Sequence, residues 1–279
     1  MVKVLLSTNV RDEDNLLEWV VHHLNLGFNH ILIFDHRSKI PVKDVLNKIP
    51  QKFITIKRIE QEKIIKTELM KMGYLISLKK KYTWTIHLDA DEFLVLNEDK
   101  NVSSFLKKYK IYDQVSVNWL LFGTGLHSVH PNGKTILETY TKSEEIVNKH
   151  IKSFLKVKTA KFQDCINPHY YILKDMSKSV NLFKQTLYPI HTYHYDLGKK
   201  YTEVPAFVAH YLFQAYGTYF KRKVDRPRDD TGEYRDIISE EELHKQYNDI
   251  DNFLIRDKYN EKNKKKIKNP IFTKNNIKK

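Results

Sequence analysis

The chain has 279 residues, of which 41% are hydrophobic, and a net charge of +14. This length is enough for one large domain with a substantial core, and a single cysteine, Cys165, excludes an internal disulfide, a zinc–cysteine cluster and a redox pair. The apolar run from Met1 to Ser7 is too short for a signal-peptide core or a membrane span, so we expect a cytoplasmic protein.

Strands and helices alternate along the first 96 residues. Val2 to Thr8 predicts a strand, Glu13 to Leu26 an amphipathic helix that ends at Gly27, and Ile31 to Phe34 a second strand. The pattern then predicts a short helix, a strand, a long helix and a further strand over residues 42–49, 53–59, 62–80 and 82–88. Near-continuous apolar strands separated by helices indicate an α/β fold, with a mostly parallel sheet and helices on both faces.

Three acids follow the last of these strands within four positions: Asp89, Asp91 and Glu92. Because carboxylates this close repel one another, the cluster is unfavourable unless water or a cation screens it. Such oxygen ligands suit Mg²⁺ or Mn²⁺, which take their remaining oxygens from water and substrate phosphates. We therefore expect a divalent cation and a diphosphate leaving group here. The alternative is that the acids form a solvated turn or cap a helix.

Other polar residues also stand at predicted strand ends. In open parallel sheets, ligands bind beyond the carboxyl ends of the strands. We therefore expect the loop from Asn9 to Glu13, together with Asp35, to converge with Asp89 on one cleft.

The second half is less regular and is expected to form the acceptor side. Residues 102–109 predict a helix, 114–119 a strand, and Pro131 to Gly133 a turn that joins two antiparallel strands. Ser239 and Glu242 form a capping-box pattern, and apolar residues continue at helical spacing to Leu254. A C-terminal amphipathic helix is therefore expected to dock on the core.

Over half of the excess positive charge lies at the C-terminal end. Residues 256–279 contain ten Lys or Arg and two acids, which predicts either attraction to an anionic membrane surface or nucleic acid, or a solvated, flexible end. The expected domains are residues 1–225 as the catalytic domain, 226–255 as a helical appendage and 256–279 as a basic tail. Within the first, residues 1–96 form the nucleotide-binding half and 97–225 the acceptor-side half.

Five segments, in order, resemble glycosyltransferase family 92 and related family 2-like proteins. They are residues 10–38, Asp89 to Leu94, Asn118 to Gly123, Lys152 to Phe154 with Pro168 and His169, and Ala209 to Tyr211 with Tyr219, Phe220 and Lys223. Ordered blocks are far more specific than one short motif. The resemblance covers residues 3–225 and implies a GT-A fold, a Rossmann-like domain fused to an acceptor-binding half. It also implies metal-dependent transfer of a hexose from a nucleotide diphosphate sugar, a UDP-sugar, to a glycan or protein acceptor, with inversion.

The resemblance also implies roles on the donor side. Asp89 and Asp91 would bind Mn²⁺ or Mg²⁺ and the donor's ribose or diphosphate, and His210 would be a distal metal ligand or a packed histidine. Asp35 would face the base or ribose. Asn9, Arg11 and Glu13 would lie on the first loop, against the nucleotide.

On the acceptor side, an inverting transfer needs a base within reach of the acceptor hydroxyl. The candidates are Glu92, Asp164 and His169; Glu92 is favoured over the other two, although it could instead brace the loop. Trp119 and Gly123 would form a sugar platform, unless Trp119 belongs to the core. Lys152 would contact a phosphate or the acceptor, or be an ordinary exposed lysine.

Two other functions compete with the transferase. A nucleic-acid-binding protein would use the basic tail and the tyrosines in a salt-sensitive way. A metal-dependent phosphohydrolase would carry His and Asp ligands at several strand ends, whereas the sequence has one strong acid cluster.

Overall fold

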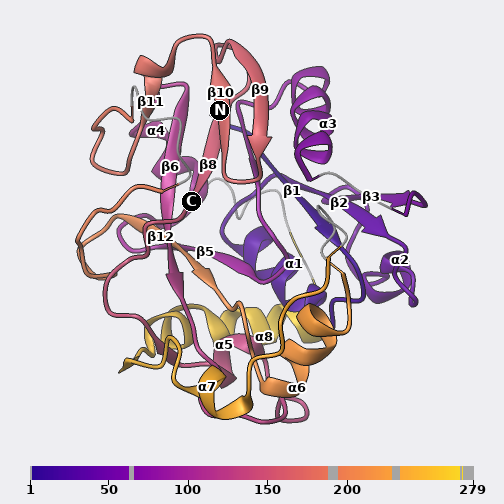
Figure 1. Ribbon diagram of the computed structural model, residues 1–279. Helices are drawn as coiled ribbons and strands as arrows, with labels where there is room; N and C mark the ends of the chain where they lie inside the picture. The colour runs from indigo at the N-terminus through magenta and orange to yellow at the C-terminus, as the bar shows by residue number, and fades with distance from the viewer. Residues whose placement is uncertain (1, 63–65, 188–193, 228–232, 271, 273–279) are drawn as a thin grey trace.

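Figure 1 shows a computed structural model of the chain, which describes residues 2–62, 66–187, 194–227, 233–270 and 272. The strands are β1 (Val4–Val10), β2 (His30–His36), β3 (Ile54–Ile59), β4 (Trp84–His87), β5 (Glu92–Leu96), β6 (Gln114–Leu121), β7 (Lys142–Ser143), β8 (Ile151–Lys156), β9 (Phe162–Asn167), β10 (Tyr170–Leu173), β11 (Ser179–Val180), β12 (Ala206–His210) and β13 (Ile250–Asp251). The α-helices are α1 (Leu16–Asn25), α2 (Val42–Val45), α3 (Lys66–Lys79), α4 (Val102–Lys107), α5 (Ile136–Thr139), α6 (Tyr216–Tyr219), α7 (Glu240–His244) and α8 (Glu261–Lys268). A 3₁₀ turn, η1 (Met176–Lys178), and two π-helices, η2 (Phe220–Val224) and η3 (Arg256–Asn260), complete the described elements.

A mixed sheet forms the centre of the fold. Its strand order is β3-β2-β1-β4-β8-β6-β12-β5, and β11 pairs with β6. The first four strands are parallel, β8 is antiparallel to both of its neighbours, and β5 is antiparallel to β12. The parallel sheet predicted for the first half is therefore confirmed, and the second half extends it with strands of both directions.

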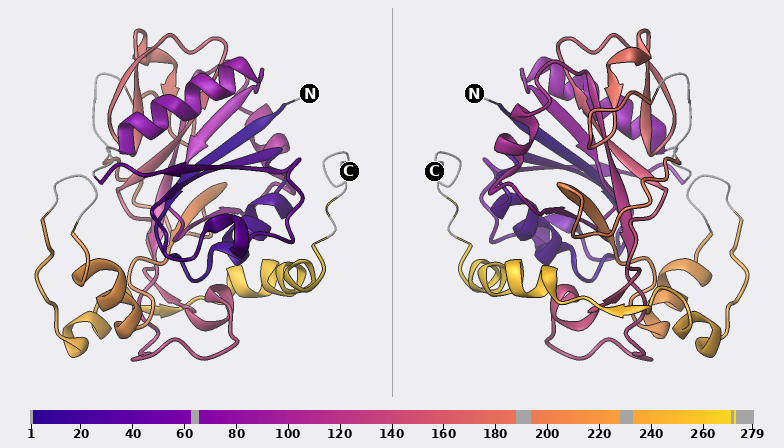
Figure 2. Two further views of the ribbon diagram at one scale, coloured as in Figure 1. Left: turned by 90° about the vertical axis from the view of Figure 1, so that its right-hand side faces the viewer. Right: turned by 90° about the vertical axis from the view of Figure 1, so that its left-hand side faces the viewer.

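Helices cover both faces of the parallel strands, as the apolar runs predicted. On one face, Leu6 belongs to the main core with Trp19 of α1; on the other, Leu5 packs with Leu69 of α3. Successive side chains of a strand point to opposite faces, so burial of both faces explains the near-continuous apolar pattern of β1. Figure 2 shows α1 and α3 on opposite sides of the sheet. Each fully buried Leu contributes roughly 1.5–3 kcal/mol.

The C-terminal end differs from the sequence-based expectation. Residues 256–268, which we placed in a flexible tail, form η3 and α8, and α8 packs against α1. Asn263 is 1% exposed, donates through Nδ2 to His22 Nδ1 at 3.2 Å and accepts at Oδ1 from Asn25 Nδ2 at 2.9 Å. This buried polar contact, together with Ile267, which packs against the main core, docks a lysine-rich helix. Of the remaining tail, residues 271 and 273–279 lie outside the described residues.

Two predicted elements of the second half are wrong. The single helix expected over residues 239–254 is α7, which ends at His244, followed by β13; Tyr247 has a φ of 58°, which an α-helix cannot accommodate. The turn at Pro131 to Gly133 leads into α5 and does not join two strands. The α5 helix is fixed by the buried Glu18, which accepts hydrogen bonds from the N–H of Ile136 and Leu137 at 2.7 and 3.2 Å. No helix in the described ranges combines the length and apolar character needed to cross a bilayer.

Candidate active site

A cleft of about 180 Å³ opens at the carboxyl ends of β1 and β4. It is lined by Asn9, Arg11, Glu13, Lys66, Asp89, Ala90, Asp91, Pro168, Arg222, Lys223, Arg226, Pro227 and Arg235. The loops after β1 and β4 therefore converge, as the strand-end rule predicted. The predicted residues Asn9, Arg11, Glu13, Asp89 and Asp91 are brought together here.

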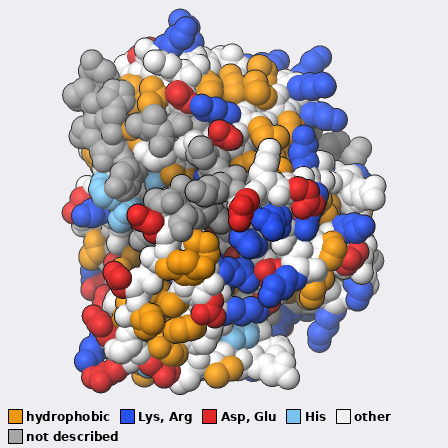
Figure 3. Space-filling view, turned by 45° about the vertical axis from the view of Figure 1, so that its right-hand side comes forward, with side chains coloured by type: hydrophobic (Ala, Val, Ile, Leu, Met, Phe, Trp, Pro, Cys, Tyr) orange, Lys and Arg blue, Asp and Glu red, His pale blue; other side chains and the backbone are white. Residues whose placement is uncertain are grey.

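The cleft carries a surplus of positive charge. Six of its lining side chains are Lys or Arg and three are acids. Figure 3 shows Lys and Arg side chains gathered beside acidic ones on one face of the molecule. A concave surface with a positive surplus attracts anions and is suited to ligands that bear phosphate groups.

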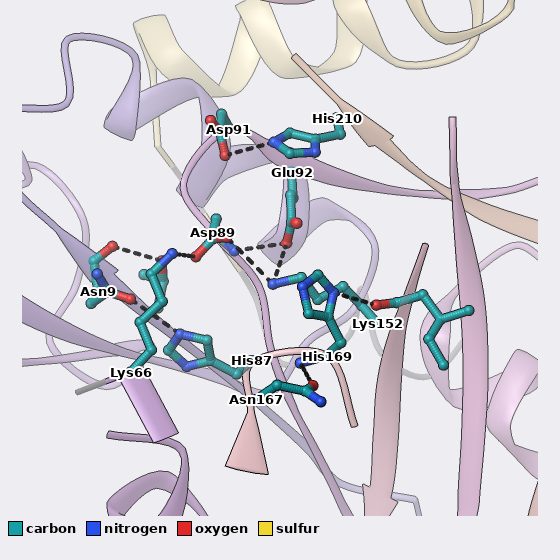
Figure 4. A network of polar contacts seen from close by, with 12 residues as sticks. Asn9, Lys66, His87, Asp89, Asp91, Glu92, Lys152, Asn167, His169 and His210 are labelled. Atoms are coloured by element: carbon teal, nitrogen blue, oxygen red, sulfur yellow. Dashed lines mark hydrogen bonds and ion pairs between the residues drawn. The ribbon is translucent and has the colours of Figure 1, made fainter. Parts of the chain in front are cut away.

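Asp89 lies between two lysines. Its Oδ1 is 2.9 Å from Lys66 Nζ and its Oδ2 is 3.3 Å from Lys152 Nζ, and Figure 4 shows the two ammonium groups approaching from different sides. Burial would raise the pKa of Asp89, but the Lys152 and Lys66 ammonium groups hold this pKa well below its usual range. Asp89 is therefore a carboxylate with both oxygens already paired.

Asp91 is buried and also faces cations. Its Oδ2 lies 3.0 Å from Arg222 Nη2 and 3.5 Å from Lys223 Nζ, and its Oδ1 lies 3.6 Å from His210 Nε2. Burial opposes ionisation, but Lys223 and Arg222 hold the pKa of Asp91 well below its usual range. The Arg222 guanidinium also reaches Glu13 Oε2 at 3.1 Å, so it links the first loop to the acid cluster.

Glu92 is fully buried and lies outside the cleft lining. Its Oε2 accepts the backbone N–H of Asp89 at 2.8 Å and lies 3.3 Å from Lys152 Nζ. Burial, opposed by Lys152, raises the pKa of Glu92 to about 7. The geometry matches the alternative in which Glu92 braces the loop that carries Asp89.

His210 is placed by β12, opposite Glu92 in the register with β5. Its ring contacts the Trp119 ring with centroids 4.3 Å apart, and its Nδ1 is buried without a hydrogen-bond partner among the described residues. The same side chain thus packs on an aromatic ring and faces Asp91. Trp119 also stacks on His150, with centroids 5.0 Å apart and an interplanar angle of 17°.

Lys152 and His169 lie close behind the cleft. Lys152 is fully buried, so the alternative of an ordinary exposed lysine is wrong. His169 follows Pro168 of the lining, and its Nδ1 donates to the carbonyl of Ile151 at 2.9 Å. Burial and the nearby Lys152 lower the pKa of His169 to about 3, which keeps its ring neutral.

Two other predicted residues, Asp164 and Gly123, lie outside the lining. Asp164 pairs with Lys71 at 2.8 Å, both side chains being about half exposed. At Gly123, a Cβ atom would lie 2.5 Å from the Asn248 side chain, so this glycine permits close packing.

Asp35 does not line the cleft; it holds its own loop together. Its carboxylate oxygens accept from the N–H of Ser38 and of Val42 at 3.1 and 3.3 Å, and Oδ2 lies 3.0 Å from Arg58 Nη1. The expected contact of Asp35 with a base or ribose stays a prediction.

Sequence reasoning missed most of the cations of the cleft. These are Lys66, Arg222, Arg226 and Arg235, with Lys223 noted only as part of the family resemblance. A signal was present, because five of the eight residues from 221 to 228 are Lys or Arg. The larger positive excess of residues 256–279 led us to expect anion binding at the C-terminal end instead.

The site fits a divalent cation only if the ligand supplies part of the coordination. Among the residues that the structure describes, no three His, Cys, Asp or Glu side chains come together as a metal cage. Asp91 Oδ1 and His210 Nε2 nevertheless face each other across 3.6 Å. Mg²⁺ usually takes one or two protein carboxylates and completes its shell with water and substrate phosphates. Asp91 of the lining would be that carboxylate, and His210 Nε2, behind it, would add a nitrogen ligand.

The fold and the cleft place the chain among the α/β proteins that carry their site beyond the carboxyl ends of parallel strands. The sequence description of glycosyltransferase family 92 matches residues 7–252, and the chain belongs to this family. The α/β fold of the GT-A type that the resemblance implied agrees with this membership and with the sheet topology.

Three similar proteins share 22% or less sequence identity with this chain. A glycosyltransferase family 92 protein of rice, Oryza sativa subsp. japonica, is 22% identical over 209 residues, covering 70% of this chain and 34% of the relative. The chain therefore spans about a third of the length of that curated relative. Among solved structures, TarS of S. aureus is 11% identical over 56% of this chain and 28% of that chain, with a TM-score of 0.34. HddC of Yersinia pseudotuberculosis is 12% identical over 70% and 89%, with a TM-score of 0.36. Likeness of this degree identifies neither a donor nor an acceptor.

Proposed function

We propose that the protein transfers a hexose from a nucleotide diphosphate sugar, a UDP-sugar, to a glycan or protein acceptor, with inversion and with Mn²⁺ or Mg²⁺ as cofactor. The observation that carries this proposal is the cleft at the strand ends, which gathers six cations around an Asp89–Asp91 pair in a family 92 chain. A diphosphate is the ligand whose charge and size suit such a cleft.

The cations of the cleft would bind and stabilise the leaving group. Negative charge develops on the diphosphate as the bond to the sugar breaks, and fixed cations aimed at that charge lower the barrier. Lys66, Arg222 and Lys223 are the candidates, because all three line the cleft beside the acids. A divalent cation held by Asp91 and His210 would add Lewis-acid stabilisation of the same oxygens.

The catalytic base is chosen from the three residues that the sequence suggested for this role. Asp164 is paired with Lys71 outside the lining, and Glu92 is buried behind Asp89. His169 is next to the lining residue Pro168, and because its Nδ1 donates to the carbonyl of Ile151, Nε2 is the ring nitrogen that can accept a proton. Burial and Lys152 make this ring a weak base in the nucleotide-free site. We therefore propose His169 as the base that takes the acceptor's proton and Glu92 as a positioning residue.

Thermal unfolding with nucleotides tests the donor class. UDP, GDP and ADP are added to the full chain with and without Mn²⁺, because a ligand that binds only the folded state raises the unfolding temperature. We expect UDP with Mn²⁺ to stabilise most, and release of UDP from UDP-hexoses to identify the sugar. No stabilisation by any of the three nucleotides, in either condition, would contradict the proposal.

A matched pair of variants links the effect to the cleft. Lys66→Gln removes a lining cation that lies 2.9 Å from Asp89, and we expect it to weaken stabilisation by UDP. Lys221→Gln removes an exposed cation that pairs with Asp14 at 2.9 Å outside the lining, and we expect it to leave the stabilisation unchanged. Equal effects of both variants would point to non-specific attraction of the nucleotide.

A further inference from the structure

We propose that Arg222 and Lys223 occupy Asp91 until the donor arrives, so that the protein binds a divalent cation only together with a nucleoside diphosphate. This inference rests on the proposed function and concerns the order of events at the same cleft. Its basis is a competition between two protein cations and a metal ion for the charge of one carboxylate, that of Asp91.

The competition follows from the contacts of Asp91. Arg222 Nη2 and Lys223 Nζ lie 3.0 and 3.5 Å from Oδ2. Asp91 is 2% exposed, and the Arg222 side chain is 9% exposed. A divalent cation that approached Oδ1 would meet two positive charges on the other oxygen with little water to screen them. The nucleotide-free site is therefore expected to repel the metal.

The donor can relieve this repulsion. A phosphate group offers a guanidinium two oxygens in a planar, bidentate arrangement, at least as favourable as a carboxylate. Arg222 and Lys223 both line the cleft, so their charged groups can turn from Asp91 to a bound diphosphate without leaving it. Asp91 then faces His210 without its former partners, and the phosphates supply the oxygen ligands that the protein lacks.

An ion pair next to these two cations holds the segment in place during such an exchange. Arg226 Nη2 lies 3.0 Å from Asp12 Oδ2. This contact fastens the chain just after η2 to the loop after β1. The two central cations can therefore change partners while η2 stays attached.

Binding of Mn²⁺ itself tests the inference. The full chain is titrated with Mn²⁺ while the electron paramagnetic resonance signal of free Mn²⁺ is followed, without nucleotide and with saturating UDP, and Mn²⁺ with UDP alone is the baseline. We expect UDP to tighten Mn²⁺ binding by about tenfold or more, and Mn²⁺ to tighten UDP binding by the same factor, because coupling between two ligands is reciprocal.

Substitution of Arg222 tests the cause. Arg222→Gln removes the main competitor, so we expect the nucleotide-free variant to bind Mn²⁺ about tenfold more tightly than the wild type, with a smaller further gain from UDP. Lys223→Gln should shift binding in the same direction by less, because its ammonium lies farther from Asp91, and it serves if the first variant does not fold. Lys221→Gln, on the same segment, should leave Mn²⁺ binding unchanged.

Two results would overturn the inference while the proposed transfer stands. The first is that the nucleotide-free wild-type protein binds Mn²⁺ as tightly as the UDP complex does. The second is that Arg222→Gln and Lys223→Gln both fold and bind Mn²⁺ with the affinity of the wild type. Failure of UDP, GDP and ADP to bind under every condition would instead overturn the proposed function.

Discussion

Glu92 Oε2 accepts the backbone N–H of Asp89 at 2.8 Å, so the third acid of the cluster holds the first one in position. The same oxygen lies 3.3 Å from Lys152 Nζ, and this ammonium reaches Asp89 Oδ2 at 3.3 Å. These three side chains thus form one closed arrangement, in which Glu92 and Lys152 are buried and Asp89 lines the cleft. The repulsion between neighbouring carboxylates, evident from the sequence, is relieved by protein cations.

Glu92→Gln separates a bracing role from a catalytic one. The amide keeps an oxygen that can accept the Asp89 N–H but gives up the charge opposite Lys152. We expect a loss of stability of about 1–3 kcal/mol, a raised KM for the donor and a kcat within about tenfold of the wild type. Steady-state kinetics over a range of pH measure this. Glu92→Ala, which removes the acceptor altogether, should raise the donor KM further. A general base would show the opposite split, with kcat reduced by about 10²–10⁴ at unchanged KM.

Asp91→Asn tests the acid that the structure surrounds with cations. Arg222 pairs with two acids, Asp91 and Glu13, and loss of the Asp91 charge leaves it with Glu13. Breaking a buried ion pair costs about 3–5 kcal/mol. We expect transfer to fall at least about 100-fold, because loss of an outer-shell partner of a metal ligand already costs about 10–100-fold. The unfolding temperature should drop while the fold is kept. Circular dichroism and UDP-hexose turnover measure the two effects. Asp14→Asn, which breaks an exposed pair with Lys221, should cost about 0–1 kcal/mol and leave transfer intact. Retained transfer in Asp91→Asn would refute a metal role for Asp91.

The parallel half of the fold was predictable because its signals are local. Strand β1 is buried on both faces, so the apolar run reports it directly, and Asp89 and Asp91 follow a strand whose end must lie at the ligand-binding edge. The cations were not predictable in this way. Arg222 is 131 positions from Asp91, and only the folded chain brings the two together. The sequence of a segment rich in Lys and Arg also does not differ between one that is exposed to solvent and one that is buried against acids.

The C-terminal end shows the limit of composition. Lysine content predicted a solvated tail, yet α8 packs on the core with Ile267 against the main apolar cluster and with Asn263 buried. The contacts of Asn263 with His22 and Asn25 span more than 230 positions. No local pattern reports such a contact. The attraction of this basic end to an anionic membrane surface stays a prediction, as do the domain boundaries.

Gly123→Ala tests whether this glycine serves packing or a sugar. The added Cβ would lie 2.5 Å from the Asn248 side chain, whose Oδ1 accepts from the N–H of Gly125 at 3.0 Å. We expect a loss of about 1–3 kcal/mol in the free energy of unfolding by urea, partly restored in a double variant with Asn248→Ala. Gly217→Ala is the control, because its Cβ would make ordinary contact with the Ser128 carbonyl at 3.5 Å. A stable Gly123→Ala protein with a raised acceptor KM would instead favour the sugar platform.

The contact between α1 and α8 predicts how stability depends on pH. His22 Nε2 donates to the carbonyl of Leu94 at 2.8 Å, so its Nδ1 is the acceptor for Asn263 Nδ2 and cannot also carry a proton. Burial lowers the pKa of His22 to about 4, whereas an unfolded histidine has a pKa of about 6.5. Between these values the unfolded chain binds a proton that the folded chain does not, so the free energy of unfolding falls as pH drops from about 6.5 to about 4.

This dependence can be assigned to His22 by changing its partner. The pKa difference of about two and a half units for His22 lowers the free energy of unfolding by roughly 3 kcal/mol at pH 4. The buried Glu18, whose pKa is raised to about 7 by burial, changes this free energy in the opposite direction. Asn263→Asp places an acceptor opposite Nδ1 and keeps the oxygen that Asn25 uses, so it favours the protonated ring. Urea unfolding at a series of pH values measures the effect. Between pH 6.5 and 4 we expect a shallower loss of stability in Asn263→Asp than in the wild type, because the variant favours protonated His22. Glu18 is common to both proteins, so its contribution does not account for a difference between them. Equal slopes in the two proteins would mean that His22 does not control the docking of α8.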